Sequence, residues 1–459
     1  MRPPNQAARD QLVSVLGRMP RASAPEIAAA LSISIRSLHR LLAELPPEHW
    51  VCAGQSRRTR YARTRALRGS HAAVPLHAVD ETGQARELSS LSLLHPQCAL
   101  MPMQESLWPV PPESRDGWWE GLPYPLYDSR PQGFLGRQFA RAEHQRLGVS
   151  PTPGDWNDDD IVHVLSQSGV DVSGNLLLGE PAFRRWLAIK MSPPEPVPEN
   201  RLGDHYLECA QQALRDGVPR SSVAGEFPKF TALRLQCHAT PHVLVKFAGA
   251  GGSAAERRWA DLLVCEHLAL DCAASLEDVT CARTRVIQHG DRTFLESERF
   301  DRFGLHGRGA LCTLDALNNA FLGAATTDWT SPVSQLHALD LVEARTVAAV
   351  ERLQWFGRLT GNTDMHLGNL SFHVEQRLRL APAYDMLPMM YAPLAGGEVP
   401  PREYTPPLPL PAQREVWNVA CASALAFWRR ASNDARISAA FQAICAGNHR
   451  ALSETAEKL

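Results

Sequence analysis

The segment from Gly361 to Met386, GNTDMHLGNLSFHVEQRLRLAPAYDM, limits what the chain can fold into more than any other stretch. Residues 370–374 and 378–380 alternate apolar and polar side chains on either side of a polar turn, which predicts a β-hairpin. In an antiparallel pair, the residue before the first strand lies near the residue after the second. We therefore expect Asn369 and Asp385 to be brought together by this hairpin.

A helix is predicted directly upstream of the hairpin. Apolar side chains recur there at helical spacing, at Val347, Val350, Leu353, Phe356 and Leu359. Gly361 follows the last of them and is a plausible C-cap. Asp364 then lies in the loop between this helix and the hairpin.

The polar residues of this segment suit phosphoryl transfer. Asp364, Asn369 and Asp385 supply oxygen atoms of the kind that Mg²⁺ binds together with substrate phosphates. Protein kinases use the same order, with a catalytic Asp, an Asn five positions later and a metal-binding Asp after a hairpin. Each residue taken alone is equally typical of a turn. A metallohydrolase using Asp364, His366 and Asp385 is disfavoured, because one histidine is few for zinc.

Two of the chain's few lysines point to a phosphate site. Among 47 basic residues there are only four lysines, at positions 190, 229, 246 and 458. Lys246 lies in the apolar, strand-like run HVLVKFAGA, and Lys229 follows the small-residue turn SSVAGEFP. A strand lysine and a turn rich in backbone N–H groups are typical of sites that hold nucleotide phosphates. The alternative for each lysine is a solvated strand end.

The first 70 residues predict a DNA-binding head. They contain 12 Arg and 4 acidic residues, whereas the remainder of the chain is acidic. Residues 23–45 show two short helical patterns joined by a tight turn, with Ser23 and Glu26 forming a capping box and Ser34 capping the second helix. This is the plan of a helix-turn-helix, whose second helix enters the major groove. The outward-facing residues of that helix are Arg36, Ser37, His39 and Arg40.

A basic hairpin is expected to follow as the wing of a winged helix. The segment WVCAGQSRRTRYARTR reads as strand, basic turn and strand, and its arginines would meet DNA phosphates or the minor groove. These are Arg57, Arg58, Arg60, Arg63 and Arg65. The alternative is a three-helix interaction module with a solvated basic tail.

Length and composition predict three units in one cytoplasmic chain. The 459 residues exceed one ordinary core, and the Pro-rich stretch MSPPEPVPEN at 191–200 is the clearest internal boundary. The predicted units are 1–70, 74–190 and 201–459. There is no apolar run long enough for a membrane span and no apolar signal core, and the ten cysteines form no CxxC pair.

Five motifs, in order, carry a family resemblance: SVAGEFPKF, VLVKF, ESERFDRFG, GNTDMHLGN and LAPAYDMLP. Residues 74–440 resemble the HipA family of bacterial serine/threonine kinases, the toxins of toxin–antitoxin systems. The chain is most similar to longer members that carry their own winged helix. The resemblance implies an α+β, two-lobed, protein-kinase-like fold preceded by a small winged helix-turn-helix domain.

The resemblance also implies a role for each motif, with ATP and Mg²⁺ as cofactors. Asp364 would be the catalytic base, with His366 in the same loop, and Asn369 and Asp385 would bind Mg²⁺. Lys246 would hold the α- and β-phosphates. The remaining nucleotide contacts would come from two segments. The hinge comprises Glu298, Phe300 and Asp301, and the phosphate-binding loop comprises Ser222, Val223, Ala224, Gly225 and Lys229.

Regulation and departures follow from the same resemblance. Ser222 matches the serine that family members autophosphorylate, which ejects the phosphate-binding loop and stops the kinase. Family members often have Lys where this chain has Gly368, so His366 or Lys229 would have to supply that charge. In the loop after Ser222, Glu226, Phe227 and Pro228 stand where family members have smaller polar residues.

Three functions are compatible with these sequence features. The first is a growth-inhibiting protein kinase toxin that acts on a protein substrate, binds duplex DNA through residues 1–70 and is neutralised by an antitoxin. The second is a transcription regulator whose kinase-like body senses nucleotide, which Gly368 and the fused head favour. The third, a small-molecule or lipid kinase, is disfavoured because there is no basic membrane-binding helix.

Overall fold

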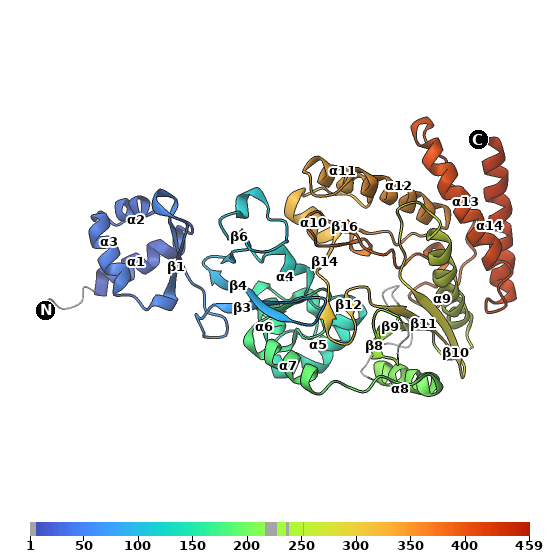
Figure 1. Ribbon diagram of the computed structural model, residues 1–459, viewed down its shortest axis with the longest axis horizontal. Coiled ribbons are helices and arrows are strands. Elements are labelled where there is room, and N and C mark those ends of the chain that lie inside the picture. Colours follow the sequence, from blue (N-terminus) through green and yellow to red (C-terminus); the bar gives the residue numbers. More distant parts are fainter. Residues whose placement is uncertain (1–5, 216–226, 236–237, 251) are drawn as a thin grey trace.

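The computed structural model describes residues 6–215, 227–235, 238–250 and 252–459. A small helical unit lies at one end of the molecule and the long C-terminal helices lie at the other (Figure 1). The two largest sheets, one of five strands and one of four, lie between them. No helix in these ranges is both long and apolar enough to cross a membrane.

The N-terminal unit consists of three helices and a two-stranded antiparallel hairpin. Its elements are α1 (Gln6–Arg18), α2 (Ala24–Ala30), α3 (Ile35–Ala43), β1 (Trp50–Ala53) and β2 (Arg60–Arg63). The predicted capping box of Ser23 and Glu26 is confirmed, as is the cap that Ser34 forms on α3. A separate hydrophobic core joins the helices to the hairpin: Leu12, Val15, Leu16, Ala22, Ile27, Ala28, Leu38, Leu41, Leu42 and Tyr61.

This unit is docked on the region that follows it. Arg65 contacts Asp159 at 2.5 Å and donates further hydrogen bonds to the carbonyl oxygens of Leu94 and Pro96. Arg68 contacts Asp160 at 2.6 Å. The expectation that Arg65 meets DNA is therefore wrong, because its guanidinium holds the head against the acidic start of a neighbouring helix.

The middle region is built on a five-stranded antiparallel sheet of order β6-β5-β4-β3-β7. Its strands are β3 (Val74–Val79), β4 (Ala85–Leu94), β5 (Cys98–Leu100), β6 (Trp118–Glu120) and β7 (Leu176–Leu178). Its helices are α4 (Tyr124–Asp128), α5 (Gly133–Leu147), α6 (Asp158–Ser168) and α7 (Glu180–Met191). The largest hydrophobic core runs from Leu76 in this sheet to Leu452 near the C-terminus, so this region packs directly on the C-terminal part.

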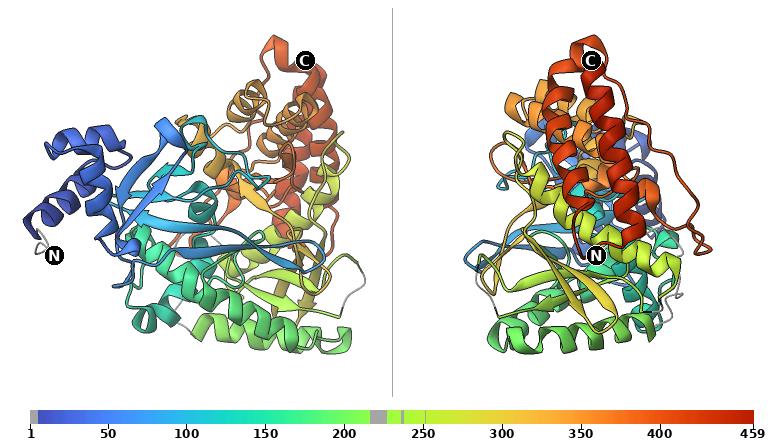
Figure 2. Two further views of the ribbon diagram at one scale, coloured as in Figure 1. Left: turned by 60° about the vertical axis from the view of Figure 1, so that its left-hand side comes forward. Right: turned by 90° about the vertical axis from the view of Figure 1, so that its right-hand side faces the viewer.

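A four-stranded antiparallel sheet of order β10-β11-β9-β8 follows. Its strands are β8 (Lys229–Leu233), β9 (His242–Phe247), β10 (Thr284–His289) and β11 (Arg292–Glu298). Helix α8 (Leu202–Arg215) packs on one face through Tyr206, against Val243, Val245 and Phe247 of β9. Helix α9 (Ala254–Ala273) packs with Leu295 of β11 in the larger core, on the other face. Figure 2 shows α8 running beneath this sheet.

The C-terminal part is mostly helical, with α10 (Leu314–Phe321), α11 (Thr330–Ala338), α12 (Ala344–Leu359), α13 (Arg414–Ala431) and α14 (Ala439–Lys458). Its short strands are β12 (Arg302–Phe303), β13 (Gly307–Arg308), β14 (Leu311–Thr313), β15 (Ser371–His373) and β16 (Arg379–Leu380). The predicted hairpin is confirmed, because Phe372 pairs with Leu380. The predicted helix is α12, which ends at Leu359. Gly361 follows shortly after it with a left-handed backbone conformation, at a φ of +72°.

Candidate active site

Lys246 stands at the centre of the site. Its Nζ atom donates to both carboxylate oxygens of Glu266, at 2.6 and 2.7 Å, and also to Oδ1 of Asp385. Lys246 comes from β9, Glu266 from α9 and Asp385 from the loop after β16. This ion-pair network joins the four-stranded sheet to the hairpin segment.

Burial and charge set the protonation states of this network. Burial lowers the pKa of Lys246, but Asp385 and Glu266 raise it more, so it stays cationic. Burial raises the pKa of Glu266 to about 6 despite the attraction of Lys246. Burial also raises that of Asp385, but Lys246 and Lys229 outweigh it and hold the pKa at about 2. Asp385 is thus an anion at neutral pH, which is the form in which a carboxylate binds Mg²⁺.

Asn362 connects Asp385 to the Asp364 loop. Its Nδ2 atom donates to the carbonyl oxygen of Asp385 at 3.1 Å, and its Oδ1 accepts from the backbone N–H of Asp364 at 3.0 Å. Asn369 donates from Nδ2 to the carbonyl oxygen of Asp364 at 2.8 Å. The hairpin was expected to bring Asn369 and Asp385 together, and in the structure they are linked through Asp364 and Asn362. Asn362 was not singled out from the sequence pattern.

Asp385 has a left-handed backbone conformation, with φ of +54°. Such a φ is uncommon for residues other than glycine and is held only where the surroundings determine it. The hydrogen bond from Asn362 holds the backbone carbonyl of Asp385, and the ion pair with Lys246 holds its side-chain carboxylate. They fix the direction of its carboxylate.

The Asp364 loop presents its two candidate catalytic side chains to solvent, since both Asp364 and His366 are exposed. The Nδ1 atom of His366 accepts the backbone N–H of Gly368 at 3.1 Å. A Cβ atom at Gly368 would lie 3.0 Å from Cε1 and Nδ1 of the His366 ring, so a side chain at position 368 would require the histidine to shift.

Lys229 shares a strand pair with Lys246. The two residues are directly opposite in the β8–β9 register, so their side chains leave the same face of the sheet. Phe227 is buried just before β8, with its ring 5.7 Å from Nζ of Lys246 and 4.7 Å from the Trp259 ring. The other predicted residues of this loop lie outside the described residues: Ser222, Val223, Ala224 and Gly225.

The hinge prediction needs correction for two side chains. Glu298 pairs with Val243, on the sheet face opposite to Lys246, and bonds Arg234 at 2.7 Å. Asp301 is buried between arginines and accepts the Gly174 backbone N–H at 2.9 Å. Neither carboxylate is directed at the Lys246 side, so nucleotide contacts there would come from the hinge backbone.

Phe300 remains suited to the predicted role. Its ring lies 5.8 Å from that of Tyr384, the residue before Asp385, and 6.1 Å from that of His373. An aromatic side chain in this position offers a flat apolar surface next to the residue that precedes Asp385.

The candidate DNA-contacting residues are mostly solvent-facing. Arg36, His39 and Arg40 are exposed on α3, whereas Ser37 is half-buried and its hydroxyl lies 3.0 Å from that of Ser34. The turn between β1 and β2 exposes Arg57 and Arg58, while Arg60 is half-buried and donates to the carbonyl oxygens of Arg57 and Thr59. The helix face and the hairpin turn thus carry exposed cations, as predicted.

The donor set fits Mg²⁺ only in company with phosphates. Within the described ranges, no three His, Cys, Asp or Glu side chains converge as a metal-binding group. Asp385 and Asn369 supply one charged and one neutral oxygen, and the Nδ2 bond of Asn369 orients its amide. Mg²⁺ is commonly held by one or two carboxylates and by substrate phosphates, which is consistent with this pair.

Comparison with known proteins defines the class. Residues 221–449 match the family model of the HipA-like C-terminal domain, and residues 70–187 match that of the YjjJ-like toxin, middle domain. The Shewanella oneidensis MR-1 toxin–antitoxin complex of HipA, HipB and operator DNA contains a chain of the same fold. It aligns with a TM-score of 0.51 at 16% identity, over 84% of this chain and 97% of that chain. The fold is therefore that of HipA-like proteins.

The particular group follows from sequence identity. The protein named Toxin YjjJ of Escherichia coli (strain K12) is 33% identical over 450 residues, which cover 98% of both chains. This chain belongs to the family of YjjJ-like toxins.

Proposed function

We propose that the protein is an ATP-dependent serine/threonine protein kinase that inhibits growth by phosphorylating a protein substrate. The observation that carries this proposal is the connected network in which Lys246 pairs with Glu266 and Asp385, and Asn362 ties Asp385 to the Asp364 loop. Kinases of this plan require the Lys–Glu pair and the metal-binding Asp to be in place together.

Each side chain has a distinct task in this proposal. The carboxylate of Asp364 accepts the proton of the substrate hydroxyl as the new O–P bond forms. Asn369 and Asp385 hold Mg²⁺, and Lys246 holds the α- and β-phosphates. Mg·ATP, when bound, supplies the transferable phosphoryl group and the metal charge that offsets its negative oxygens.

Control by phosphorylation of Ser222 belongs to the same proposal. The family resemblance puts Ser222 on the phosphate-binding loop, where a phosphate would add about 1.5 to 2 negative charges near the phosphates of ATP and disfavour ATP binding. A Ser222→Ala variant should stay active longer. The proposal also includes a neutralising antitoxin and a cytoplasmic location, with the HipA–HipB complex as the analogy.

The N-terminal unit is proposed to bind duplex DNA as a winged helix-turn-helix. Helix α3 would enter the major groove with Arg36, Ser37, His39 and Arg40, while Arg57, Arg58 and Arg60 contact phosphates. Three observations support this proposal: α2 and α3 each begin at an N-capping serine, the unit has its own hydrophobic core, and its helix face and hairpin turn carry exposed arginines.

A second candidate function is a DNA-binding regulator whose kinase-like body senses nucleotide with little transfer. Two observations favour it. Gly368 stands where HipA family members often have a lysine, so the loop lacks that positive charge. The N-terminal unit is also held against the middle region by the ion pair of Arg65 and Asp159. Nucleotide-dependent changes in the body would then reach the DNA-binding unit through a fixed contact.

Growth and promoter output distinguish these candidates. The kinase-toxin proposal predicts that expressed wild type slows growth, that Asp364→Asn does not, and that Ser222→Ala slows it more. Equal growth inhibition by wild type and Asp364→Asn would contradict the proposal. The regulator candidate instead predicts no effect of Ser222→Ala on growth, with promoter repression that changes when cellular ATP is varied.

A further inference from the structure

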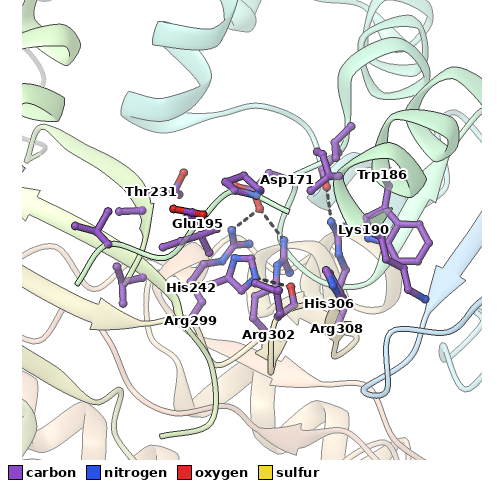
Figure 3. Close-up of a pocket in the computed structure, with 18 of the residues that line it drawn as sticks. Asp171, Trp186, Lys190, Glu195, Thr231, His242, Arg299, Arg302, His306 and Arg308 are labelled. Carbon is purple, nitrogen blue, oxygen red and sulfur yellow. Dashed lines mark hydrogen bonds and ion pairs between the residues drawn. The ribbon is translucent and has the colours of Figure 1, made fainter. Parts of the chain in front are cut away.

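A cavity lies away from the Lys246 site, where the middle region meets the four-stranded sheet. It has a volume of about 370 Å³ and is bordered by the end of α7, the segment leading to α8, the edges of β8 and β9, and the hinge (Figure 3). This volume lies within the range of pockets for small molecules.

The floor of the pocket is a cluster of charges, in which Asp301, Arg302 and Arg308 are buried and Asp171 is exposed. Asp171 contacts Arg299 at 2.6 Å and Arg302 at 3.0 Å, and Figure 3 shows both guanidinium groups directed at its carboxylate. Asp301 accepts from the same two arginines, at 2.9 and 2.6 Å. Arg308 adds a third cation to these two carboxylates, so the cluster has one unmatched positive charge.

Arg308 carries that surplus. It is 6% exposed, and its Nη2 atom donates to the carbonyl oxygen of Val170 at 2.6 Å. Its Nη1 atom is buried without a hydrogen-bond partner among the described residues. Burial, together with repulsion from Arg302, lowers the pKa of Arg308 to about 9. A buried guanidinium with an unused donor is costly unless an anion completes it.

The rest of the wall is largely apolar. Trp186, Ile189, Leu233, Val243 and Leu305 all line the pocket. The charged side chains of Lys190 and Glu195 also line it, and their charges cancel. The pocket therefore combines one unmatched cationic group with surface for an apolar body.

The pocket is separate from the proposed nucleotide site. Val243 lines it and belongs to the face of β9 that packs on α8, whereas Lys246 leaves the opposite face towards α9. Lys246, Glu266 and Asp385 are not among the residues that line the pocket, whereas Arg299 and Arg302, which do line it, flank Phe300 in the hinge.

We propose that this pocket binds a small organic anion, a carboxylate or phosphate monoester carried on an apolar or aromatic body. The anionic group pairs with the guanidinium of Arg308, which lines the pocket and carries the unmatched charge, and the body lies against Trp186 and Leu305. Because the ligand touches both α7 and the hinge, its binding stabilises the contact between the middle region and the four-stranded sheet. This site does not depend on phosphoryl transfer.

The probes are phenylacetate, phenyl phosphate, inorganic phosphate and the neutral analogue phenylacetamide, each titrated calorimetrically into the full-length protein. ADP is included at saturation in a parallel series, so that binding at the nucleotide site is excluded. The proposal predicts saturable binding of at least one aromatic anion with a dissociation constant below about 1 mM, and much weaker binding of phenylacetamide. Phenylacetate and phenyl phosphate distinguish the two headgroups. No saturable binding of either anion, or equal binding of phenylacetamide, would overturn the proposal.

Two variants locate the site. Ile189→Glu places a carboxylate on an exposed position of the pocket wall and should weaken anion binding at least about tenfold. Leu187→Glu, exposed on the same helix but outside the lining, is the matched control and should bind normally. Arg308→Gln removes the proposed partner and should also abolish binding. If Arg308→Gln does not fold, the Ile189→Glu and Leu187→Glu pair still decides, since equal binding by both would place the anion elsewhere.

Discussion

The Nζ atom of Lys246 lies 2.6 Å from Oε1 of Glu266, with both side chains buried between β9 and α9. If this pair positions Lys246 for phosphates, Glu266→Gln should lower kcat/KM for ATP by at least about tenfold, because the lysine is then held by Asp385 alone. Steady-state kinetics over a range of ATP concentrations measures this. Asp271→Asn, an exposed change on the same helix, is the control and should leave the constants unchanged.

Asn362 offers a test of the link between the two halves of the site. Asn362→Ala removes the hydrogen bonds to Asp385 and Asp364 and leaves their backbone groups unsatisfied, at a cost of about 1–3 kcal/mol in unfolding free energy. We expect a loss of phosphoryl transfer in protein that is still folded. Thr363→Ala, at the exposed neighbouring position, should retain both stability and transfer. Full transfer by Asn362→Ala would show that this residue does not organise the site.

Asp301 should stabilise the hinge rather than bind nucleotide. Asp301→Asn leaves Arg299 and Arg302 short of a buried carboxylate, so the unfolding free energy should fall by about 3 kcal/mol at neutral pH. Burial opposes ionisation, but the two arginines lower the pKa of this carboxyl below its ordinary value of 3.8. The stabilisation is therefore complete above that value and is lost as pH falls below it. Denaturant titrations of both proteins at several pH values should converge only in strong acid.

DNA binding by the head should depend on salt through the hairpin arginines. Replacing Arg57, Arg58 and Arg60 together should weaken binding to all duplexes and reduce the log–log salt slope by up to about 2.7. Arg36→Ala should in addition relax sequence preference, because α3 carries the base-contacting residues. Fluorescence anisotropy at several salt concentrations measures both effects. An unchanged slope in the triple variant would exclude these arginines from the interface.

Local sequence patterns predicted several elements because their causes are local. Ser23 and Glu26 are three residues apart and cap the same helix, and Phe372 and Leu380 pair across a short turn. Periodicity of two or 3.6 residues is visible in such stretches without knowledge of the tertiary fold. The order of Asp364, Asn369 and Asp385 is equally local.

The features that were missed depend on contacts between distant segments. Glu266 could have been noticed as an acidic residue within the buried stripe of a helix, but its partner Lys246 is on another element. The face from which Glu298 leaves its strand is set by pairing with Val243, and Arg65 meets Asp159 from another unit. Strand register and unit docking are decided by tertiary packing, which one sequence does not display.

The proposed kinase activity depends most directly on Asp364, whose carboxylate accepts the proton of the substrate hydroxyl during phosphoryl transfer. Purified wild type and Asp364→Asn are each incubated with Mg²⁺ and γ-labelled ATP, and labelled residues are mapped by mass spectrometry alongside calorimetric binding of Mg·ATP. The account predicts label on wild type, including Ser222, and at least about a 100-fold loss in Asp364→Asn with ATP binding retained. Labelling of Asp364→Asn at the wild-type rate, or no transfer by wild type that binds Mg·ATP, would contradict it.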